Sequence, residues 1–190
     1  MFAFLAIDFE TTGSVPGFPN EPWQIGTVPV SEDGTVSIGG GLDSLLRIDV
    51  DRPFNKFAPG RHAKIRAELA AAPTLTGLWP DLAPRLAGPV VAHNVGTERT
   101  ILEQAAPLHL PGPWIDTLAL ARAAWPTAPS HALEDLIPAL GLLPRLRELV
   151  PGREPHDAYY DAVACALLLL HLLSFPAWRD LDPERLSRIR

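Results

Sequence analysis

The chain has 190 residues, of which 47% are hydrophobic and 20% charged; this composition supports one folded domain with a substantial core and excludes a disordered chain. Its single cysteine, Cys165, excludes a disulfide framework and lies in an apolar run, 162–173, where a buried and unreactive thiol is expected. That run is too short to span a bilayer, and residues 1–5 lack the basic flank of a signal peptide. We therefore expect a single cytoplasmic domain, residues 1–190, that does not associate with membranes.

The formal net charge of −6 argues against a nucleic-acid partner, because such proteins usually present a basic stripe. Bound divalent cations would offset part of this charge if several of the acids are metal ligands. Two basic clusters remain as candidate phosphate contacts: residues 61–66, and the group Arg145, Arg147 and Arg153. Ordinary solvated surface charge is the alternative for both clusters.

The first fifty residues predict three strands in an antiparallel meander, over residues 2–7, 23–30 and 35–48. Residues 31–34 are typical of a hairpin connection, and the triple glycine at 39–41 breaks the third predicted strand and suggests a bend there. The amino-terminal quarter of the chain is therefore expected to be a small antiparallel sheet.

After residue 59 the pattern changes to helices and short strands. Two buried strands are expected at residues 89–92 and 114–116. The expected helices cover residues 61–69, 75–86, a segment beginning near 96, 117–125, 133–140, 158–173 and a terminal helix capped by Asp182. Strands first, followed by alternating strands and helices, predict an α/β fold in which helices flank a mixed sheet.

Two carboxylates, Asp8 and Glu10, lie two residues apart where the first predicted strand ends. Because side chains alternate along a strand, both acids would project from one face and Phe9 from the other. Acids held this close repel each other unless a proton or a cation lies between them, and hard oxygen ligands suit Mg²⁺ or Mn²⁺. The turn that follows, 11–13, would allow its backbone to approach a ligand closely. The alternative is a pair of solvated acids in a turn.

A second group of polar residues follows the predicted strand 89–92, at the start of a helix. His93 and Asn94 offer hydrogen-bond donors and acceptors where the strand ends. Glu98 lies in the first helical turn, from which it can project toward the mouth of the sheet. Two of these residues also have structural alternatives, because Asn94 could close a turn and Glu98 could stabilise the helix dipole.

A third group, in segment 155–162, combines His156 with Asp161. Within one helix these side chains would lie about 140° apart, so His156 is better placed on the loop before the helix, with Asp157 as the cap and Asp161 in the first turns. A histidine on a movable loop beside a metal-binding carboxylate suits a general base. The alternative is a surface histidine beside a capping aspartate.

The order and spacing of these groups resemble the DEDDh branch of the DnaQ-like 3′–5′ exonucleases. The matching segments are Asp8-Phe9-Glu10-Thr11-Thr12-Gly13, Ala92-His93-Asn94, and His156 with Asp161. Intervening stretches, 62–65 followed by 72–74, and 116–122, resemble epsilon-type proofreading exonucleases. The resemblance covers residues 4–173 and leaves 174–190 as a C-terminal helical extension. It implies an RNase H-like fold, with a mixed five-stranded sheet flanked by helices.

The chain departs from this family in its second motif. The family has an aromatic residue followed by aspartate, whereas this chain has Thr97 followed by Glu98. The longer arm of Glu98 still presents a carboxylate, so we expect an altered metal preference or rate rather than inactivity. Losing the aromatic ring at Thr97 would weaken the grip on the terminal base, because one base–aromatic stack contributes about 1–3 kcal/mol.

The resemblance implies a hydrolase that uses two divalent ions, Mg²⁺ or Mn²⁺. In that scheme Asp8 bridges the ions, Glu10 and Asp161 hold the first, Glu98 supports the second and His156 deprotonates the attacking water. The terminal nucleotide would leave as a nucleoside 5′-monophosphate. The residues expected to contact that nucleotide are Thr11, Thr12, Gly13, His62, His93, Asn94 and Thr97.

The predicted partner is a nucleic acid, with the 3′ end of single-stranded DNA favoured by the signature at residues 11–13. An oligoribonuclease-like RNA exonuclease is one alternative, because cleft geometry determines how the 2′-hydroxyl is recognised. A nucleic-acid-binding module with impaired catalysis is another, and Glu98 is the sequence feature that favours it. A polymerase partner and a homodimer are both compatible with the sequence. The apolar run 167–173 fits either a core or an interface.

Overall fold

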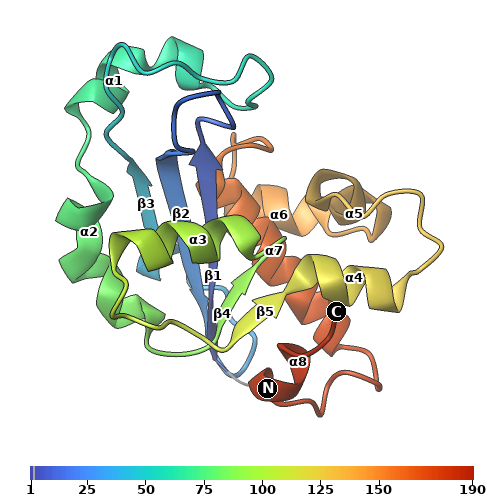
Figure 1. Ribbon diagram of the computed structural model, residues 1–190. Helices are drawn as coiled ribbons and strands as arrows, with labels where there is room; N and C mark the ends of the chain where they lie inside the picture. Colours follow the sequence, from blue (N-terminus) through green and yellow to red (C-terminus); the bar gives the residue numbers. More distant parts are fainter. Residues whose placement is uncertain (2) are drawn as a thin grey trace.

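A mixed five-stranded sheet forms the centre of the fold in the computed structural model, which describes residue 1 and residues 3–190 (Figure 1). The strands are β1 Phe4–Thr11, β2 Pro22–Val30, β3 Leu42–Leu45, β4 Val90–Ala92 and β5 Trp114–Asp116. Their order is β3-β2-β1-β4-β5. β1, β2 and β3 pair in antiparallel fashion, whereas β4 pairs parallel to β1 and β5 parallel to β4. The predicted mixed sheet is confirmed.

β1 extends beyond its predicted end at residue 7, because the segment with the two acids pairs with β2. Asp8 lies opposite Gly26 and Glu10 opposite Gln24, and the register shifts between residues 10 and 11. Residue 2, where the predicted strand begins, lies outside the described residues. The backbone of both acids is therefore fixed by the sheet.

The third predicted strand, 35–48, is wrong over most of its length. Only β3 forms a ladder with β2, while Ile38–Gly40 forms a 3₁₀ turn, η1. A Cβ atom added at Gly41 would lie 2.1 Å from the carbonyl oxygen of Thr27, so the chain crosses β2 closely at this point. The predicted break at the triple glycine is therefore observed.

Helices account for most of the remaining chain. The α-helices are α1 Arg66–Ala71, α2 Leu75–Leu82, α3 Gly96–Ala105, α4 Thr117–Ala124, α5 Leu133–Ala139, α6 Leu143–Leu149, α7 Ala158–Leu173 and α8 Pro183–Leu186. The 3₁₀ turns η2 His62–Lys64 and η3 Ala83–Leu86 occupy parts of two predicted helices, 61–69 and 75–86. Sequence analysis does not predict α6, which is only seven residues long and has a proline near its start.

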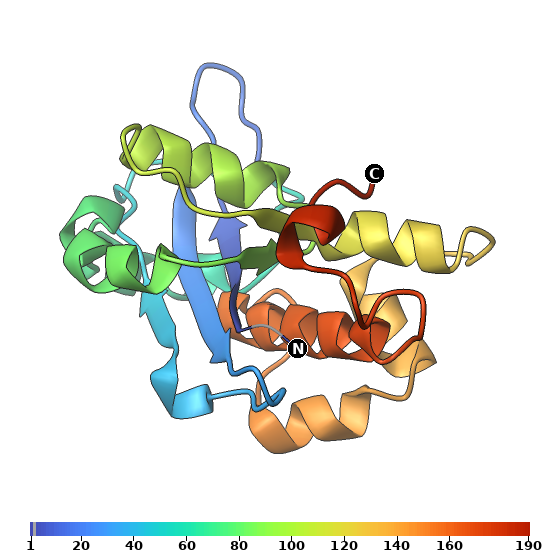
Figure 2. The ribbon, with the colours of Figure 1, turned by 90° about the horizontal axis from the view of Figure 1, so that it is seen from below.

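Helices cover both faces of the sheet, with α3 on one face and α7 on the other (Figure 2). The larger apolar cluster lies on the α7 side and includes Ala6 of β1 and Leu168 of α7. Cys165 belongs to it, and burial raises the pKa of its thiol, which agrees with the expected unreactive cysteine. A second cluster, with Ile7 and Leu102, lies on the α3 side. The sheet therefore separates two cores.

The segment after α7 packs back onto the larger cluster. Leu186 of α8 is buried in it, and Trp178 packs against its edge. Across the described part of the chain, no helix combines the length and the apolar character needed to cross a membrane.

Candidate active site

A cavity of about 650 Å³ opens where β1 and β4 end, beside the first turn of α7. Its lining residues come from each of the three motif segments, at residues 8–10, 93–94 and 156–161, and from α4, α5 and the loop between them. They are Asp8, Phe9, Glu10, His93, Asn94, Leu118, Arg122, Pro129, Ser130, His131, Ala132, Leu133, Glu134, His156 and Asp161. Segments far apart in the sequence therefore meet at one hollow.

Asp8 and Glu10 project from the side of β1 that faces α7. Ala6, two residues before Asp8, belongs to the apolar cluster under α7, whereas Phe9 belongs to the cluster under α3. Glu10 is only 7% exposed. The alternation expected for this strand is therefore observed, and it places both acids at the cavity.

Gly26 of β2 allows α7 to approach these acids closely. It lies opposite Asp8, and a Cβ atom added to it would come within 2.2 Å of the carbonyl oxygen of Ala158, the first residue of α7. Any side chain at this position would push the start of the helix away from the sheet. The bare glycine therefore lets the first turn of α7 bring Asp161 to the cavity.

The loop before α7 has a defined geometry around His156. Asp157 caps the helix by accepting a hydrogen bond from the backbone N–H of Tyr160 (3.2 Å), and the backbone N–H of His156 donates to Oδ2 of Asp161 (2.8 Å). His156 has a φ of 65°, which is rare for a residue with a side chain and is often found at functional sites. Its Nε2 lies 3.2 Å from Oε2 of Glu134. The predicted loop position and cap are confirmed.

Glu98 reaches the site from the first turn of α3. It is 3% exposed, and its Oε2 is buried without a hydrogen-bond partner among the described residues. The charge of Glu98 contributes to the raised pKa of Asp8. Glu98 is therefore a buried acid next to the site, although it is not among the residues that line the cavity.

Burial raises the pKa values of all four acids, because a charged carboxylate is poorly solvated inside the protein. It raises the pKa of Glu10 to about 8 and the pKa values of Glu98 and Asp161 to about 7. The pKa of Asp8 is raised well above its ordinary value by burial and by the charges of Asp161, Glu98 and Glu10. Ionising all four acids at once is therefore unfavourable unless positive charge enters the site.

The donor set fits a divalent metal ion. One ligand atom each from Glu10, His156 and Asp161 lie within 4.8 Å of one another, and Asp8 lines the same cavity. The unpartnered oxygen of Glu98 is a buried acceptor that a cation would satisfy. Carboxylate oxygens are the ligands that Mg²⁺ and Mn²⁺ prefer. These residues could therefore hold metal at this site.

His93 and Asn94 line the cavity beside β4. Nε2 of His93 donates to the carbonyl of His131 (2.9 Å), and burial lowers the pKa of the ring, so His93 is neutral near pH 7. The backbone N–H of Asn94 donates to Oδ1 of Asp116 (2.9 Å), and a φ of 71° turns the chain there. The side chain of Asn94 is exposed and free to meet a ligand.

Several residues expected to contact the nucleotide do not line the cavity. Thr12 is fully buried and accepts a hydrogen bond from the backbone N–H of Glu21 (3.0 Å), and Thr11, Gly13 and Thr97 lie beside the acids without facing the hollow. His62 stacks on Phe54, with ring centroids 4.3 Å apart, and hydrogen-bonds to the Ala58 carbonyl. The structure gives Thr12 and His62 places in the framework around the site.

Among the residues at the site that the sequence analysis did not select, two shape it most directly. Glu134 contacts His156 across the cavity, and Gly26 makes room for α7. Glu134 follows a loop of undistinguished composition, so nothing local marks it as functional. An isolated glycine inside a predicted strand is the one signal that could have identified Gly26, because it indicates close approach of another backbone.

Comparisons with known proteins agree with this geometry. A sequence profile of the RNase_T family, described as Exonuclease, matches residues 5–169. Exodeoxyribonuclease 10 of Escherichia coli strain K12 is 28% identical over 162 residues, in an alignment covering 76% of this chain and 67% of that protein. The 3′-5′ exonuclease DinG of Staphylococcus haemolyticus is 29% identical over 192 residues, covering 98% of this chain but only 20% of DinG.

Solved structures show the same fold. Exonuclease X in complex with 5′ overhanging duplex DNA has a TM-score of 0.74 and 28% identity, with 100% of this chain and 99% of that chain covered. The nuclease domain of 3′hExo, a DEDDh family member bound to rAMP, has a TM-score of 0.69 and 16% identity, with 90% and 92% covered. Since the family profile spans most of the sequence, the chain belongs to the RNase_T exonuclease family, the DnaQ-like 3′–5′ exonucleases with an RNase H-like fold.

Proposed function

We propose that this chain removes nucleoside 5′-monophosphates from the 3′ end of DNA and that Asp8, Glu10, Glu98 and Asp161 together hold two divalent ions, Mg²⁺ or Mn²⁺. The observation that carries the proposal is the convergence of Asp8, Glu10 and Asp161 beside His156 in one cavity, with the buried carboxylate of Glu98 close enough for its charge to raise the pKa of Asp8. Without cations such a cluster is electrostatically unfavourable, so a role in metal binding explains why it exists.

When bound, divalent ions of this kind activate water and neutralise charge on a phosphodiester. The chain itself supplies the base. His156 accepts a proton on its imidazole ring, and Glu134, whose Oε2 lies 3.2 Å from Nε2, stabilises the imidazolium that forms. The hydrogen bond from the backbone N–H of His156 to the carboxylate of Asp161 holds the ring beside the metal-binding acids during this proton transfer.

The terminal nucleotide occupies the cavity between the acids and the wall formed by His93 and Asn94. Neutral His93, fixed by its bond to the His131 carbonyl, forms a rigid wall, and the exposed amide of Asn94 can hydrogen-bond to the nucleotide. Thr11, Thr12 and Gly13 support the turn beside it. A cavity of about 650 Å³ lies in the range usual for small-ligand sites.

DNA is favoured over RNA because the relatives near 28% identity are named for DNA: Exodeoxyribonuclease 10, and Exonuclease X solved with duplex DNA. The single-stranded 3′ end is the proposed form. An RNA exonuclease is the alternative within the same chemistry, and it is an explicit outcome of the test below. The reach of Glu98 into the site speaks against a module that binds nucleic acid without cleaving it.

The proposed catalytic unit is a single domain over residues 1–190. Its core covers residues 4–173, and residues 174–190 form an extension of turns and the short helix α8, which contributes Leu186 to the apolar cluster. The narrower resemblance to epsilon-type proofreading exonucleases stays a prediction.

Product analysis on matched DNA and RNA oligonucleotides tests this function directly. Each substrate carries a 5′ label, and shortening in single-nucleotide steps with Mg²⁺ or Mn²⁺ is expected, with DNA degraded faster than RNA. Chelator and Asp8→Ala should each abolish the shortening. Faster RNA cleavage selects the RNA exonuclease, and binding without shortening of either substrate contradicts the enzyme.

A further inference from the structure

A second cavity, of about 600 Å³, lies on the other side of His156 from the acidic one. His156 lines both cavities, so its loop forms the wall between them. The residues of the second cavity that carry charge are Arg61, Lys64, Arg153, Glu154 and Asp157. The acidic site therefore borders directly on a cavity that is lined by more basic side chains than acidic ones.

The basic side of this hollow belongs to segment 52–66, which is unlike the rest of the chain. The chain has a formal net charge of −6, yet this segment contains five Lys and Arg residues and no acid, including both lysines of the sequence, Lys56 and Lys64. Segment 52–66 therefore forms a local positive region on an acidic protein.

Two basic side chains of this segment are available to a ligand. Lys64 is exposed and forms no ion pair among the described residues, and Arg61 is exposed with only a distant contact, 3.9 Å, to Asp157. Arg153 is already committed, because its guanidinium bonds to both Asp43 and Asp157. Arg153 thus neutralises Asp157, and the free positive charge in the cavity is that of Arg61 and Lys64.

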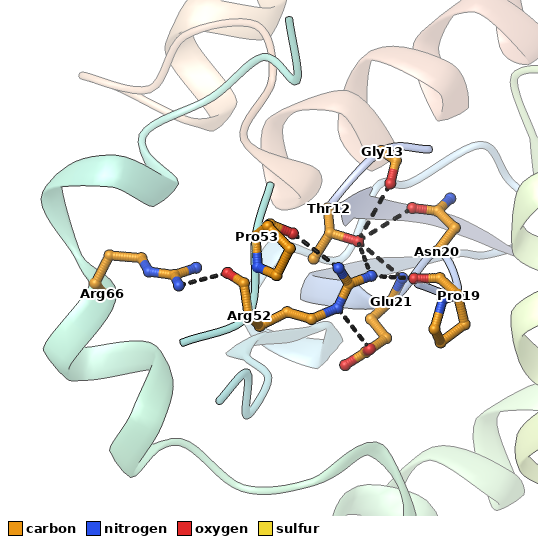
Figure 3. Close-up of polar contacts among 8 residues, drawn as sticks. All are labelled: Thr12, Gly13, Pro19, Asn20, Glu21, Arg52, Pro53 and Arg66. Atoms are coloured by element: carbon orange, nitrogen blue, oxygen red, sulfur yellow. Dashed lines mark hydrogen bonds and ion pairs between the residues drawn. The ribbon is translucent and has the colours of Figure 1, made fainter. Parts of the chain in front are cut away.

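Arg52 anchors one end of the segment (Figure 3). This guanidinium is buried, with only 6% of the residue exposed, and donates to Oε1 of Glu21 (2.8 Å), to the hydroxyl of Thr12 (3.3 Å) and to the carbonyls of Pro19 and Pro53. Segment 52–66 is thereby fastened to the loop that follows Glu10.

The other end of the segment is held by Arg66. Its guanidinium donates to the carbonyl of Arg52 (2.6 Å; Figure 3). It also donates to the carbonyl of Val50 (2.6 Å) and lies over the ring of Phe54, 4.6 Å from its centroid. His62 stacks on the Phe54 ring. His62, predicted to touch the nucleotide, thus holds the stretch that carries Arg61 and Lys64. A segment fixed at both ends binds without a large loss of conformational entropy.

We propose that the second cavity receives the phosphodiester backbone of the nucleic-acid substrate and that Arg61 and Lys64 each contact a phosphate. This inference rests on the proposed function, because it concerns the same substrate. The acidic site alone would repel an anionic strand, and a fixed basic hollow at its edge compensates for that repulsion. Charge contacts of this kind position the strand without reading its sequence.

The test is the salt dependence of oligonucleotide binding. Fluorescence anisotropy with a labelled single-stranded DNA 12-mer in chelator measures binding while no cleavage occurs. Each phosphate contact contributes about 0.7 to the slope of log K against log salt for single strands. Arg61→Gln/Lys64→Gln should therefore lower the slope by about 1.4 and weaken binding several-fold at low salt.

A matched control removes two charges elsewhere. Arg179 and Arg188 are exposed and belong to the segment after α7. That segment, which includes α8, lies at the end of the sheet far from segment 52–66 (Figure 1). Arg179→Gln/Arg188→Gln should leave the slope unchanged, and the swap Arg61→Lys/Lys64→Arg should keep it close to the parent value. With metal present, Arg61→Gln/Lys64→Gln should raise KM for the 12-mer and leave kcat within about twofold, which a general loss of structure would not do.

The proposed phosphate contacts are contradicted if Arg61→Gln/Lys64→Gln leaves the slope of log K against log salt unchanged, or if the control variant lowers that slope equally. The two proposals fail separately. Normal exonuclease activity with an unchanged slope defeats only the basic cavity, whereas salt-dependent binding without any cleavage defeats the proposed function and leaves the basic cavity standing.

Discussion

The side of β1 that faces α7 is apolar at one end and acidic at the other. At one end, Ala6 packs with Leu168 in the apolar cluster under α7. At the other end, Asp8 and Glu10 meet Asp161 of the same helix in the acidic cavity. The apolar end stabilises the fold through burial, whereas the acidic end buries charge that destabilises it in the absence of cations. Stability and catalytic potential are therefore located at different ends of the same pair of elements.

The largest expected effect is on the acidic end. Asp8→Asn should lower kcat/KM by at least about 10³-fold, because cation binding supplies several kcal/mol of charge stabilisation and each 1.36 kcal/mol corresponds to tenfold in rate. The same variant without metal should unfold at higher denaturant than the parent at pH 8, because it removes a repelling carboxylate. Steady-state kinetics and urea unfolding measure the two effects. Glu103→Gln, an exposed acid of α3, should change neither.

A substitution at the apolar end should instead lower stability and leave catalysis nearly unchanged. Leu168 is fully buried, and Leu168→Ala should lower the free energy of unfolding by about 2–5 kcal/mol through lost burial and a residual cavity. At temperatures where the variant is folded, kcat should stay within about twofold of the parent. A large loss of kcat in the folded variant would show that the two ends are not separable.

The acidic end should also make the metal-free protein sensitive to pH. Glu10, Glu98 and Asp161 have folded-state pKa values raised to about 8, 7 and 7, so between about pH 4.5 and 8 the folded chain retains protons that the unfolded chain releases. The free energy of unfolding should therefore be highest near pH 4.5 and fall as pH rises to 8, by up to about 1.4 kcal/mol per pH unit for each retained proton.

Divalent cations replace these protons and should remove the decline. Thermal unfolding from pH 5 to 8, with and without Mn²⁺, measures this loss of stability with rising pH. The metal-free variant Glu10→Gln should show a shallower decline than the parent, because one titrating acid is gone. A flat profile in the metal-free parent would contradict the buried acidic cluster.

The smallest expected effect is at Glu98. Glu98→Asp shortens the arm by one methylene and should change kcat/KM by less than tenfold, with a change in the ratio of Mg²⁺-supported to Mn²⁺-supported rates. Glu98→Gln removes the charge and should cost about 10–100-fold. Equal activity of Glu98→Gln and the parent would remove this residue from the metal site.

Strong local signals made parts of the fold predictable. β5 and α7 have the predicted bounds, because an Asp157 cap and a long apolar run define the helix and turn residues isolate the strand. α6 has no such signal: it is short and contains an early proline, and it gains its stability from packing on α7. Periodicity cannot reveal a helix that depends on tertiary contacts.

The same distinction applies to the site. The acids could be selected because their order and spacing along the chain are specific, and the structure brings Asp8, Glu10, Glu98 and Asp161 together. His62 and Thr12 lie elsewhere, because stacking on Phe54 and bonding to Arg52 depend on segments that meet only in the folded chain. Glu134 was not selected for the same reason, since its contact with His156 exists only in the folded chain.

The most direct test of the central claim is a crystal structure of the wild-type chain soaked in Mn²⁺, with anomalous diffraction data. We expect two Mn²⁺ peaks in the acidic cavity, coordinated by oxygens of Asp8, Glu10, Glu98 and Asp161. Anomalous maps without a peak at these oxygens, at a Mn²⁺ concentration that supports nuclease activity, would contradict the account.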